Sequence, residues 1–204
     1  MKKIALVLIL GSTFAAIGGI FWYQEGQYLL PTPVPKDYRV VLPDEIVRYD
    51  STLIPQQHLK PILLHFFNPD CPCSRFNIKH FYSLQRIYKN KIDFYVVVAD
   101  SEKVQPAKKL IDTDITIIVD SDEKLAKACG VYSTPQAALI QSTNQLYFRG
   151  NYNRARYCTD KNTNFVEMAM DSLVANKEAP YFNPLATRSY GCNIREEEYI
   201  LELP

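Results

Sequence analysis

Short apolar runs alternate along the chain with segments whose apolar residues recur every three or four positions. Residues 61–67 (PILLHFF), 92–100 (IDFYVVVAD) and 114–120 (DITIIVD) are rich in aliphatic, β-branched and aromatic side chains, which predicts buried strands. Residues 73–90 lie between the first two runs and have apolar side chains at helical spacing. An amphipathic helix is therefore expected there, directly after the first strand.

The same reading gives the remaining elements and their order. We expect a short helix at 101–112 and a capped helix at 121–130 that Gly130 closes. Two strands joined by a polar turn follow at 136–140 and 145–150, and a last amphipathic helix at 164–177. The order β-α-β-α-β-α-β-β-α predicts an α/β fold, a mixed sheet with helices on both faces. The loop after the first strand then lies at a carboxyl-end edge of the sheet, where such folds place their sites.

The N-terminal segment has a different pattern. Residues 4–23 contain no charge and end in Trp22 and Tyr23, and Lys2 and Lys3 precede them. Twenty helical residues span a hydrocarbon core of roughly 30 Å, and basic residues favour the cytoplasmic side. We expect one transmembrane helix with the rest of the chain outside the cytoplasm; the alternative is a cleaved signal peptide.

Composition changes this picture little. With 204 residues and 47% apolar composition, the chain has room for one domain of ordinary size. Its net charge of +1, spread over both signs, gives no basic surface, so no nucleic-acid partner is expected. We expect a membrane anchor at 1–23 and a proline-rich spacer with the domain lead-in at 24–57. A globular domain follows at 58–176, and a C-terminal tail packed on that domain at 177–204.

Five cysteines raise the question of pairing. Outside the cytoplasm a thiol is paired, buried or functional, and an odd number leaves at least one outside any intrachain disulfide. Cys129 reads as a small buried apolar residue. Cys158 and Cys192 flank the last helix, so a Cys158–Cys192 disulfide that holds the tail is one expectation. The other is that Cys192 reaches the active site as a resolving thiol.

Cys71 and Cys73 stand at the start of the first predicted helix, in DCPCS. Unpaired N–H groups and the helix dipole stabilise a thiolate there, which lowers the cysteine pKa from its free value near 8.5. Cys71 lies where this effect is largest, which makes it the expected nucleophile.

Residues 65–76 (HFFNPDCPCSRF) resemble the active-site segment of thioredoxins. Residues 119–152, which include Thr134 and Pro135, are similar to the second half of membrane-anchored, redoxin-type thioredoxins. The resemblance covers roughly 58–175 and implies a thioredoxin-like fold, with Pro135 in a cis peptide facing the cysteine. It further implies that substrate contacts involve Thr134, Pro135, Asp70 and Pro72.

This chain departs from the family pattern at the second cysteine. Cys73 stands one place early, and Ser74 occupies the position of the usual resolving cysteine. An ordinary thioredoxin disulfide is therefore excluded. Either Cys71 and Cys73 form a tighter and more easily reduced ring, or a distant cysteine resolves the mixed disulfides of Cys71.

Two further positions differ from the family. His65 replaces a buried acid that relays protons, so it is a candidate proton carrier, although a hydrogen-bonded core histidine is the alternative. Asp70 replaces an aromatic residue beside Cys71, and its carboxylate is expected to raise the pKa of that thiol.

These features favour an enzyme, a membrane-anchored thiol-disulfide oxidoreductase or isomerase of the bacterial envelope, single-pass in the inner membrane with its domain in the periplasm. Its partners would be protein thiols and disulfides, without a cofactor. One alternative is a Cu(I)-binding assembly factor of thioredoxin fold with Cys71 and Cys73 as ligands; such factors also use a distant histidine, and the sequence does not place His65 or His80 as that third ligand. A non-catalytic interaction domain is another. A peroxidase is disfavoured because the threonine expected three residues before the reactive cysteine is missing.

Overall fold

A computed structural model describes residues 2–26, 30–54, 58–111, 114–155, 157–194 and 199–200. It divides into two compact units, Met1–Pro31 and Thr32–Pro204, which we describe separately.

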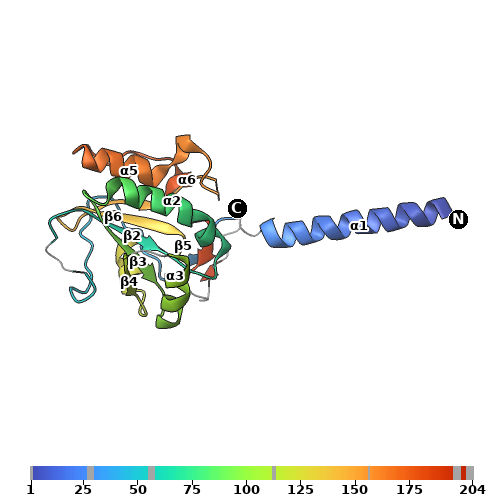
Figure 1. Cartoon of the computed structure of the whole chain (residues 1–204), viewed down its shortest axis with the longest axis horizontal. Helices are drawn as coiled ribbons and strands as arrows, with labels where there is room; N and C mark the ends of the chain where they lie inside the picture. The colour runs from blue at the N-terminus through green and yellow to red at the C-terminus, as the bar shows by residue number, and fades with distance from the viewer. Residues whose placement is uncertain are drawn as a thin grey trace. The chain divides into compact units, whose positions relative to one another are not determined.

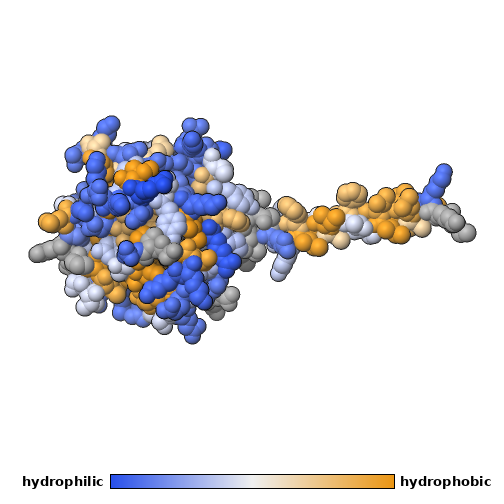
Figure 2. Space-filling model, viewed as in Figure 1, coloured by the Kyte–Doolittle hydropathy of each residue, from blue (hydrophilic) through white to orange (hydrophobic). Residues whose placement is uncertain are grey.

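The first unit is built on the helix α1 (Lys2–Glu25). Its segment Lys3–Gln24, of 22 residues, has a mean hydropathy of 2.3 and is long and apolar enough to cross a membrane. At 1.5 Å per residue it extends roughly 33 Å. Its aliphatic and aromatic side chains are exposed along its length, as Figure 2 shows. The expected apolar helix is therefore present, by length and composition.

The second unit contains a five-stranded mixed sheet in the order β4-β3-β2-β6-β7. The strand β2 pairs in parallel with β3 and antiparallel with β6, and β3 pairs in parallel with β4. The hairpin of β6 and β7 closes the other edge. These strands are β2 (Ile62–Phe66), β3 (Asp93–Val98), β4 (Thr116–Val119), β6 (Gln136–Ile140) and β7 (Leu146–Gly150). The expected mixed sheet is confirmed.

Helices cover both faces of this sheet. Those of the second unit are α2 (Pro72–Tyr88), α3 (Val104–Leu110), α4 (Lys124–Cys129), α5 (Phe165–Val174) and α6 (Pro184–Thr187), with 3₁₀ turns at Ser101–Lys103 and Lys161–Thr163. Figure 1 shows α2, α5 and α6 on one side of the sheet.

Two apolar clusters fill the space on either side of the sheet. One joins α2, α3 and α5 to the face that carries Leu63, Val96 and Leu139. The other joins α4 and the lead-in residues 41–54 to the opposite face. Alternate residues of β3 enter different clusters, as the period of two in a strand requires. All five residues of β2 are buried, because it has a strand on each side and a cluster on each face.

The register of the central strands positions the site. Phe66, the last residue of β2, lies opposite Gln136, the first residue of β6. Because these strands are antiparallel, the loop that follows β2 and the loop that precedes β6 lie at the same edge of the sheet. Cys71 follows the first loop and Pro135 ends the second.

The C-terminal tail returns to this edge. The Asn151 side chain donates to the carbonyl oxygens of Leu185 and Arg188, at 2.9 and 2.6 Å. Beyond α6, the short strand β8 (Cys192–Asn193) pairs with β5 (Ser133–Thr134), and β9 (Tyr199–Ile200) pairs with β1 (Val34–Pro35). Sequence patterns predict no helix or strand in the tail, because its short elements form through contacts with the rest of the domain.

The packing of α2 gives a direct test of the core. Leu84 is 1% exposed, and Ile87 on the same helix is 57% exposed. We expect Leu84→Ala to lower the free energy of unfolding by about 2–5 kcal/mol, since it leaves a cavity between α2 and the sheet. The matched Ile87→Ala change should stay within about 0.5 kcal/mol of the parent. Urea denaturation measures both, and equal losses would contradict this packing.

Candidate active site

Cys71 lies at the junction of β2 and α2. Its backbone is extended (φ −79°, ψ 120°), and Pro72 takes the first helical position, where a proline costs no hydrogen bond. The helix continues for 17 residues, so its dipole is developed. Cys71 is 1% exposed and lies at the positive end of α2. The positive end of the helix favours thiolate over thiol once the residue is reduced.

Cys71 forms a disulfide with Cys192 of the tail, with their Cα atoms 6.0 Å apart and a separation of 121 positions in sequence. The expected Cys158–Cys192 disulfide is therefore wrong. Neither does Cys71 pair with Cys73. The physical reason lies in the tail: its pairing with β5 places Cys192 beside Cys71 at the N-terminus of α2, and not beside Cys158. Cys192 as the partner of the active-site cysteine was the rival expectation, and the structure agrees with it.

The loop before β6 completes the site. The Thr134–Pro135 peptide bond is cis, as the resemblance to thioredoxins implied. The Cys71 sulfur lies 3.5 Å from the Thr134 carbonyl oxygen, and the Thr134 hydroxyl donates to the Cys192 carbonyl oxygen at 3.4 Å. Cys71, Thr134, Pro135 and Cys192 therefore meet at one point, although they are distant in sequence.

Cys73 and Ser74 lie in the first turn of α2, and both are buried. Cys73 is a thiol outside any disulfide. The hydroxyl of Ser74 accepts a hydrogen bond from the backbone N–H of Asn68, at 3.3 Å. At the position where the resolving cysteine of thioredoxins stands, this chain has a residue that holds the loop between β2 and α2.

Asp70 forms an ion pair on the surface. Its carboxylate pairs with the ammonium group of Lys103, and this hydrogen bond raises the pKa of Lys103. The positive charge offsets the negative charge of Asp70. The expected opposition of Asp70 to a Cys71 thiolate is weakened for that reason.

His65 is fully buried in the core. Its Nδ1 lies 2.8 Å from the Tyr152 hydroxyl, and its ring stacks on Phe81 with centroids 4.3 Å apart. Burial lowers the pKa of His65 to about 3. A histidine of such low pKa is a poor proton acceptor at neutral pH, so this geometry fits the alternative of a hydrogen-bonded core histidine better than a proton carrier.

The other two cysteines lie away from this point. Cys129, at the end of α4, is fully buried, and burial raises the pKa of its thiol well above the ordinary value. Cys158 accepts a hydrogen bond from the Asn77 side chain at 3.2 Å, and burial raises its pKa as well. Both thiols are therefore poor nucleophiles at neutral pH.

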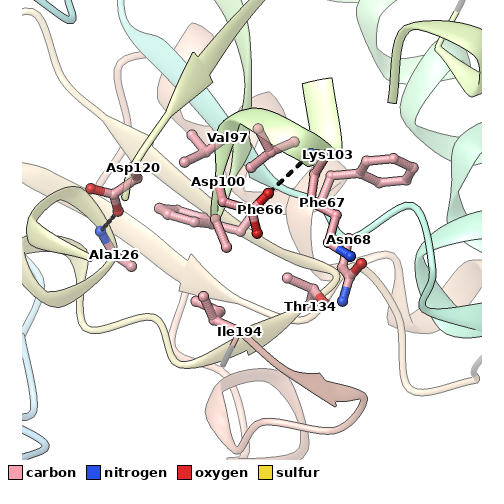
Figure 3. Close-up of a pocket in the computed structure, with 12 residues that line it drawn as sticks. Phe66, Phe67, Asn68, Val97, Asp100, Lys103, Asp120, Ala126, Thr134 and Ile194 are labelled. Carbon is pink, nitrogen blue, oxygen red and sulfur yellow. Dashed lines mark hydrogen bonds between the residues drawn. The ribbon is translucent and has the colours of Figure 1, made fainter. Parts of the chain in front are cut away.

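A small cavity lies at the carboxyl ends of β2, β3 and β4, and Thr134 is among the residues that line it (Figure 3). It has a volume of about 40 Å³. Its apolar walls include Phe66, Val97 and Ala126, and Ile194 enters from the tail. Asp120 lies at the rim, but its carboxylate accepts hydrogen bonds from the N–H groups of Leu125 and Ala126 and so caps α4. The cavity therefore has one apolar wall, and polar residues that include Asn68, Asp100 and Lys103 line the rest of it.

A metal site was the alternative for Cys71 and Cys73. Within the described residues there is no group of three or more His, Cys, Asp and Glu side chains that could hold a metal ion.

Sequence patterns missed two parts of the site, which are the cavity and the pairing of the tail strand β8 with β5. The cavity is lined by residues from five segments, which no local pattern links. The tail gave one signal, a glycine directly before Cys192. Gly191 has φ +141°, and a Cβ atom there would lie 2.2 Å from the Thr134 carbonyl oxygen. A Gly-Cys pair in an irregular tail is thus a sign of close backbone approach.

A family model described as a domain of unknown function, DUF6436, matches residues 44–194. The chain belongs to the DUF6436 family. The match covers the sheet, α2, the loop with Pro135 and the tail as far as β8. No curated protein sequence matches the chain.

Solved structures share the fold at low identity. A hypothetical protein, SMc02350, from Sinorhizobium meliloti is 18% identical, with 77% of this chain and 96% of that one covered and a TM-score of 0.63. An uncharacterized conserved protein from Geobacillus kaustophilus is 15% identical, covering 84% and 100%, with a TM-score of 0.60. A PrxQ mutant from Xylella fastidiosa is 17% identical, covering 68% and 98%, with a TM-score of 0.50. The fold is thioredoxin-like.

The buried His65 predicts a pH-dependent stability. Its pKa is about 3 in the folded protein and about 6.5 when unfolded, so its contribution is complete above pH 6.5 and is lost as the pH falls toward 3. The slope reaches at most about 1.4 kcal/mol per pH unit for one proton. Urea denaturation of the parent and His65→Phe between neutral pH and pH 4.5 should show a shallower decline in the variant. Parallel declines would contradict the assignment.

Proposed function

We propose that this protein is a thiol-disulfide oxidoreductase or isomerase in which Cys71 is the nucleophile and Cys192 is its resolving partner. The observation that carries the proposal is the Cys71–Cys192 disulfide at the N-terminus of α2, against the Thr134 carbonyl oxygen. Of the cysteines, Cys71 combines a helix N-terminus with a disulfide partner brought in from a distant segment. Cys129 and Cys158 have pKa values raised by burial, which suits them less to exchange.

The reduced protein reacts first through Cys71. Its thiolate attacks one sulfur of a substrate disulfide; the new bond joins Cys71 to the substrate, and the second substrate sulfur leaves as a thiolate. Cys192 then attacks the Cys71 sulfur, re-forms the observed disulfide and releases the first substrate sulfur as a thiolate. The substrate has gained two electrons and the protein has lost them.

The reverse direction uses the same bonds. A substrate thiolate attacks Cys71 of the disulfide and Cys192 leaves, after which a second substrate thiolate displaces Cys71 and closes a substrate disulfide. A thiol reductant or a disulfide oxidant, small molecule or protein, returns the Cys71–Cys192 pair to its starting state. An isomerase cycle begins and ends with both cysteines reduced and needs no net donor.

The membrane placement is part of the same proposal. The apolar helix Lys3–Gln24 supports a single-pass anchor, and Lys2 and Lys3 favour a cytoplasmic N-terminus. The second unit would then face the periplasm, where disulfides persist. Its partners there would be proteins with thiols or disulfides.

Trapping of mixed disulfides tests the cysteine roles. In full-length protein in detergent, Cys192→Ser should accumulate a mixed disulfide with a model protein that carries non-native disulfides, because the resolving thiol is gone. Cys71→Ser should trap none, and Cys73→Ser should resolve its mixed disulfide as the parent does. Gel electrophoresis without reductant, followed by peptide mass mapping, measures each adduct.

The cysteine controls sharpen this result. Cys158→Ser is a matched control, because it removes a thiol of the same domain that lies outside the disulfide. An adduct that persists in Cys71→Ser would contradict the role of Cys71. Accumulation in Cys73→Ser instead of Cys192→Ser would show that Cys73 is the resolving thiol.

A further inference from the structure

The place where tail residues 191–194 dock beside β5, here called the seat, has the form of a polypeptide-binding site. β8 lies antiparallel to β5, with Thr134 opposite Cys192 and Ser133 opposite Asn193. The backbone N–H of Ile194 donates to the Tyr132 carbonyl oxygen at 3.3 Å and extends the pairing by one residue. An exposed strand edge pairs in this way with any extended segment, since the hydrogen bonds use backbone atoms alone. Side-chain pockets then decide which segments are preferred.

Two features of this seat select particular side chains. At the residue before the cysteine, any Cβ atom would meet the Thr134 carbonyl oxygen at 2.2 Å, so glycine fits and larger residues do not. At the second residue after the cysteine, Ile194 points into the cavity and packs with the cluster that contains Phe66, Val97 and Ala126 (Figure 3). If Ile194 withdrew, the space it occupies would join the cavity of about 40 Å³ and accept one aliphatic side chain.

The seat also has features that favour exchange of its occupant. The Ser133 hydroxyl and the Asn193 side-chain oxygen are both buried at this seam without a hydrogen-bond partner among the described residues. Both atoms regain water when the tail leaves, which lowers the preference for the docked state. The paired strand is two residues long, so the disulfide to Cys71 is the strongest link that holds residues 191–194 beside β5.

The tail stays close to the seat when it is released. Asn151 fixes residues 185–188 to β7 through two hydrogen bonds, and Ala186 is fully buried. Cys192 follows Ala186 by six residues, a reach of roughly 20 Å in an extended chain. Cys192 therefore remains at a high effective concentration near Cys71.

We infer that the edge of β5 and the adjoining cavity form the substrate site for an extended polypeptide of the pattern Gly-Cys-Xaa-aliphatic, and that residues 191–194 occupy this site in the oxidised protein. The inference rests on the proposed function and adds to it a substrate class. Substrate and tail compete for one seat, so the return of Cys192 to Cys71 displaces the substrate strand as it releases the substrate sulfur. Resolution of the mixed disulfide and product release thereby become one event.

A series of peptides tests the pattern. The probe is the hexapeptide Ser-Tyr-Gly-Cys-Asn-Ile, blocked at both ends, with its cysteine bonded to thionitrobenzoate. The reduced, full-length Cys192→Ser variant attacks the peptide sulfur through Cys71, and the coloured thionitrobenzoate thiolate leaves. We expect replacement of the peptide glycine by valine, or of its isoleucine by aspartate, to slow the second-order rate by about tenfold or more. A scrambled peptide of the same composition should be equally slow.

Variants of the protein show which part of the site gives the preference for glycine and which part gives the preference for isoleucine. Adding Gly191→Val to Cys192→Ser should expel the tail and so speed the reaction of the parent peptide with Cys71. Ala126→Leu, made in the Cys192→Ser background, fills the cavity. It should remove the preference for isoleucine over alanine in the peptide and keep the preference for glycine. If that variant fails to fold, the peptide series alone decides.

The possible results separate the two proposals. Equal rates for all peptides, with Cys71 reacting normally with a small aromatic disulfide reagent, would overturn the inferred site and leave the role of Cys71 intact. A Cys71 that reacts with neither the peptides nor the small reagent would overturn the proposed function and this inference together. If the protein prefers both glycine and isoleucine in the peptide, and Ala126→Leu removes only the preference for isoleucine, the result supports the proposed function and the inferred substrate site.

Discussion

The pairing of β2 with β3 on one side and β6 on the other is the constraint on which the site depends. Phe66 lies opposite Gln136, and this register brings the loop before α2 to the loop that contains Thr134 and Pro135. A shift by one residue would move each side chain of β2 from one apolar cluster to the other. With the register fixed, Cys71 stands at the start of α2 within 3.5 Å of the Thr134 carbonyl oxygen.

The edge formed in this way accounts for the tail. β5 leaves its backbone groups open to a partner strand, and β8 supplies that strand with Cys192 opposite Thr134. Gly191 permits the close approach and Ile194 closes the cavity. Because the disulfide joins residues 121 positions apart, the redox state of Cys71 governs how firmly the tail is held. The Cys71–Cys192 disulfide therefore couples the redox state of the site to the docking of the tail.

The sequence predicted the parts of the fold that local patterns encode. The buried runs around Leu63 and Val96 and the helical spacing after Cys71 gave the strands, their order and the mixed sheet. Cys71 at a helix start and the loop with Pro135 followed from the same patterns together with a resemblance to thioredoxins. Each of these signals lies within a short stretch of chain, where periodicity and residue type carry the information.

The pairing of Cys192 was left open because it depends on a contact across the fold. The residues next to Cys158 and Cys192 in sequence do not indicate which cysteine each can reach, because the path of the tail follows from its contacts with Asn151 and with the edge of β5. The sequence also left open whether His65 is a proton carrier or a core histidine, because its contacts Tyr152 and Phe81 come from distant segments. Tertiary contacts decide such assignments.

The central claim is that Cys71 and Cys192 form the working redox pair, and a disulfide map of the isolated, oxidised protein tests it most directly. Thiols are blocked under denaturing acid conditions, the chain is digested without reductant, and the linked peptides are identified by mass spectrometry. The account predicts one linked pair that contains Cys71 and Cys192, with Cys73, Cys129 and Cys158 recovered as blocked thiols. A Cys71–Cys73 or Cys158–Cys192 linkage as the main species would contradict it.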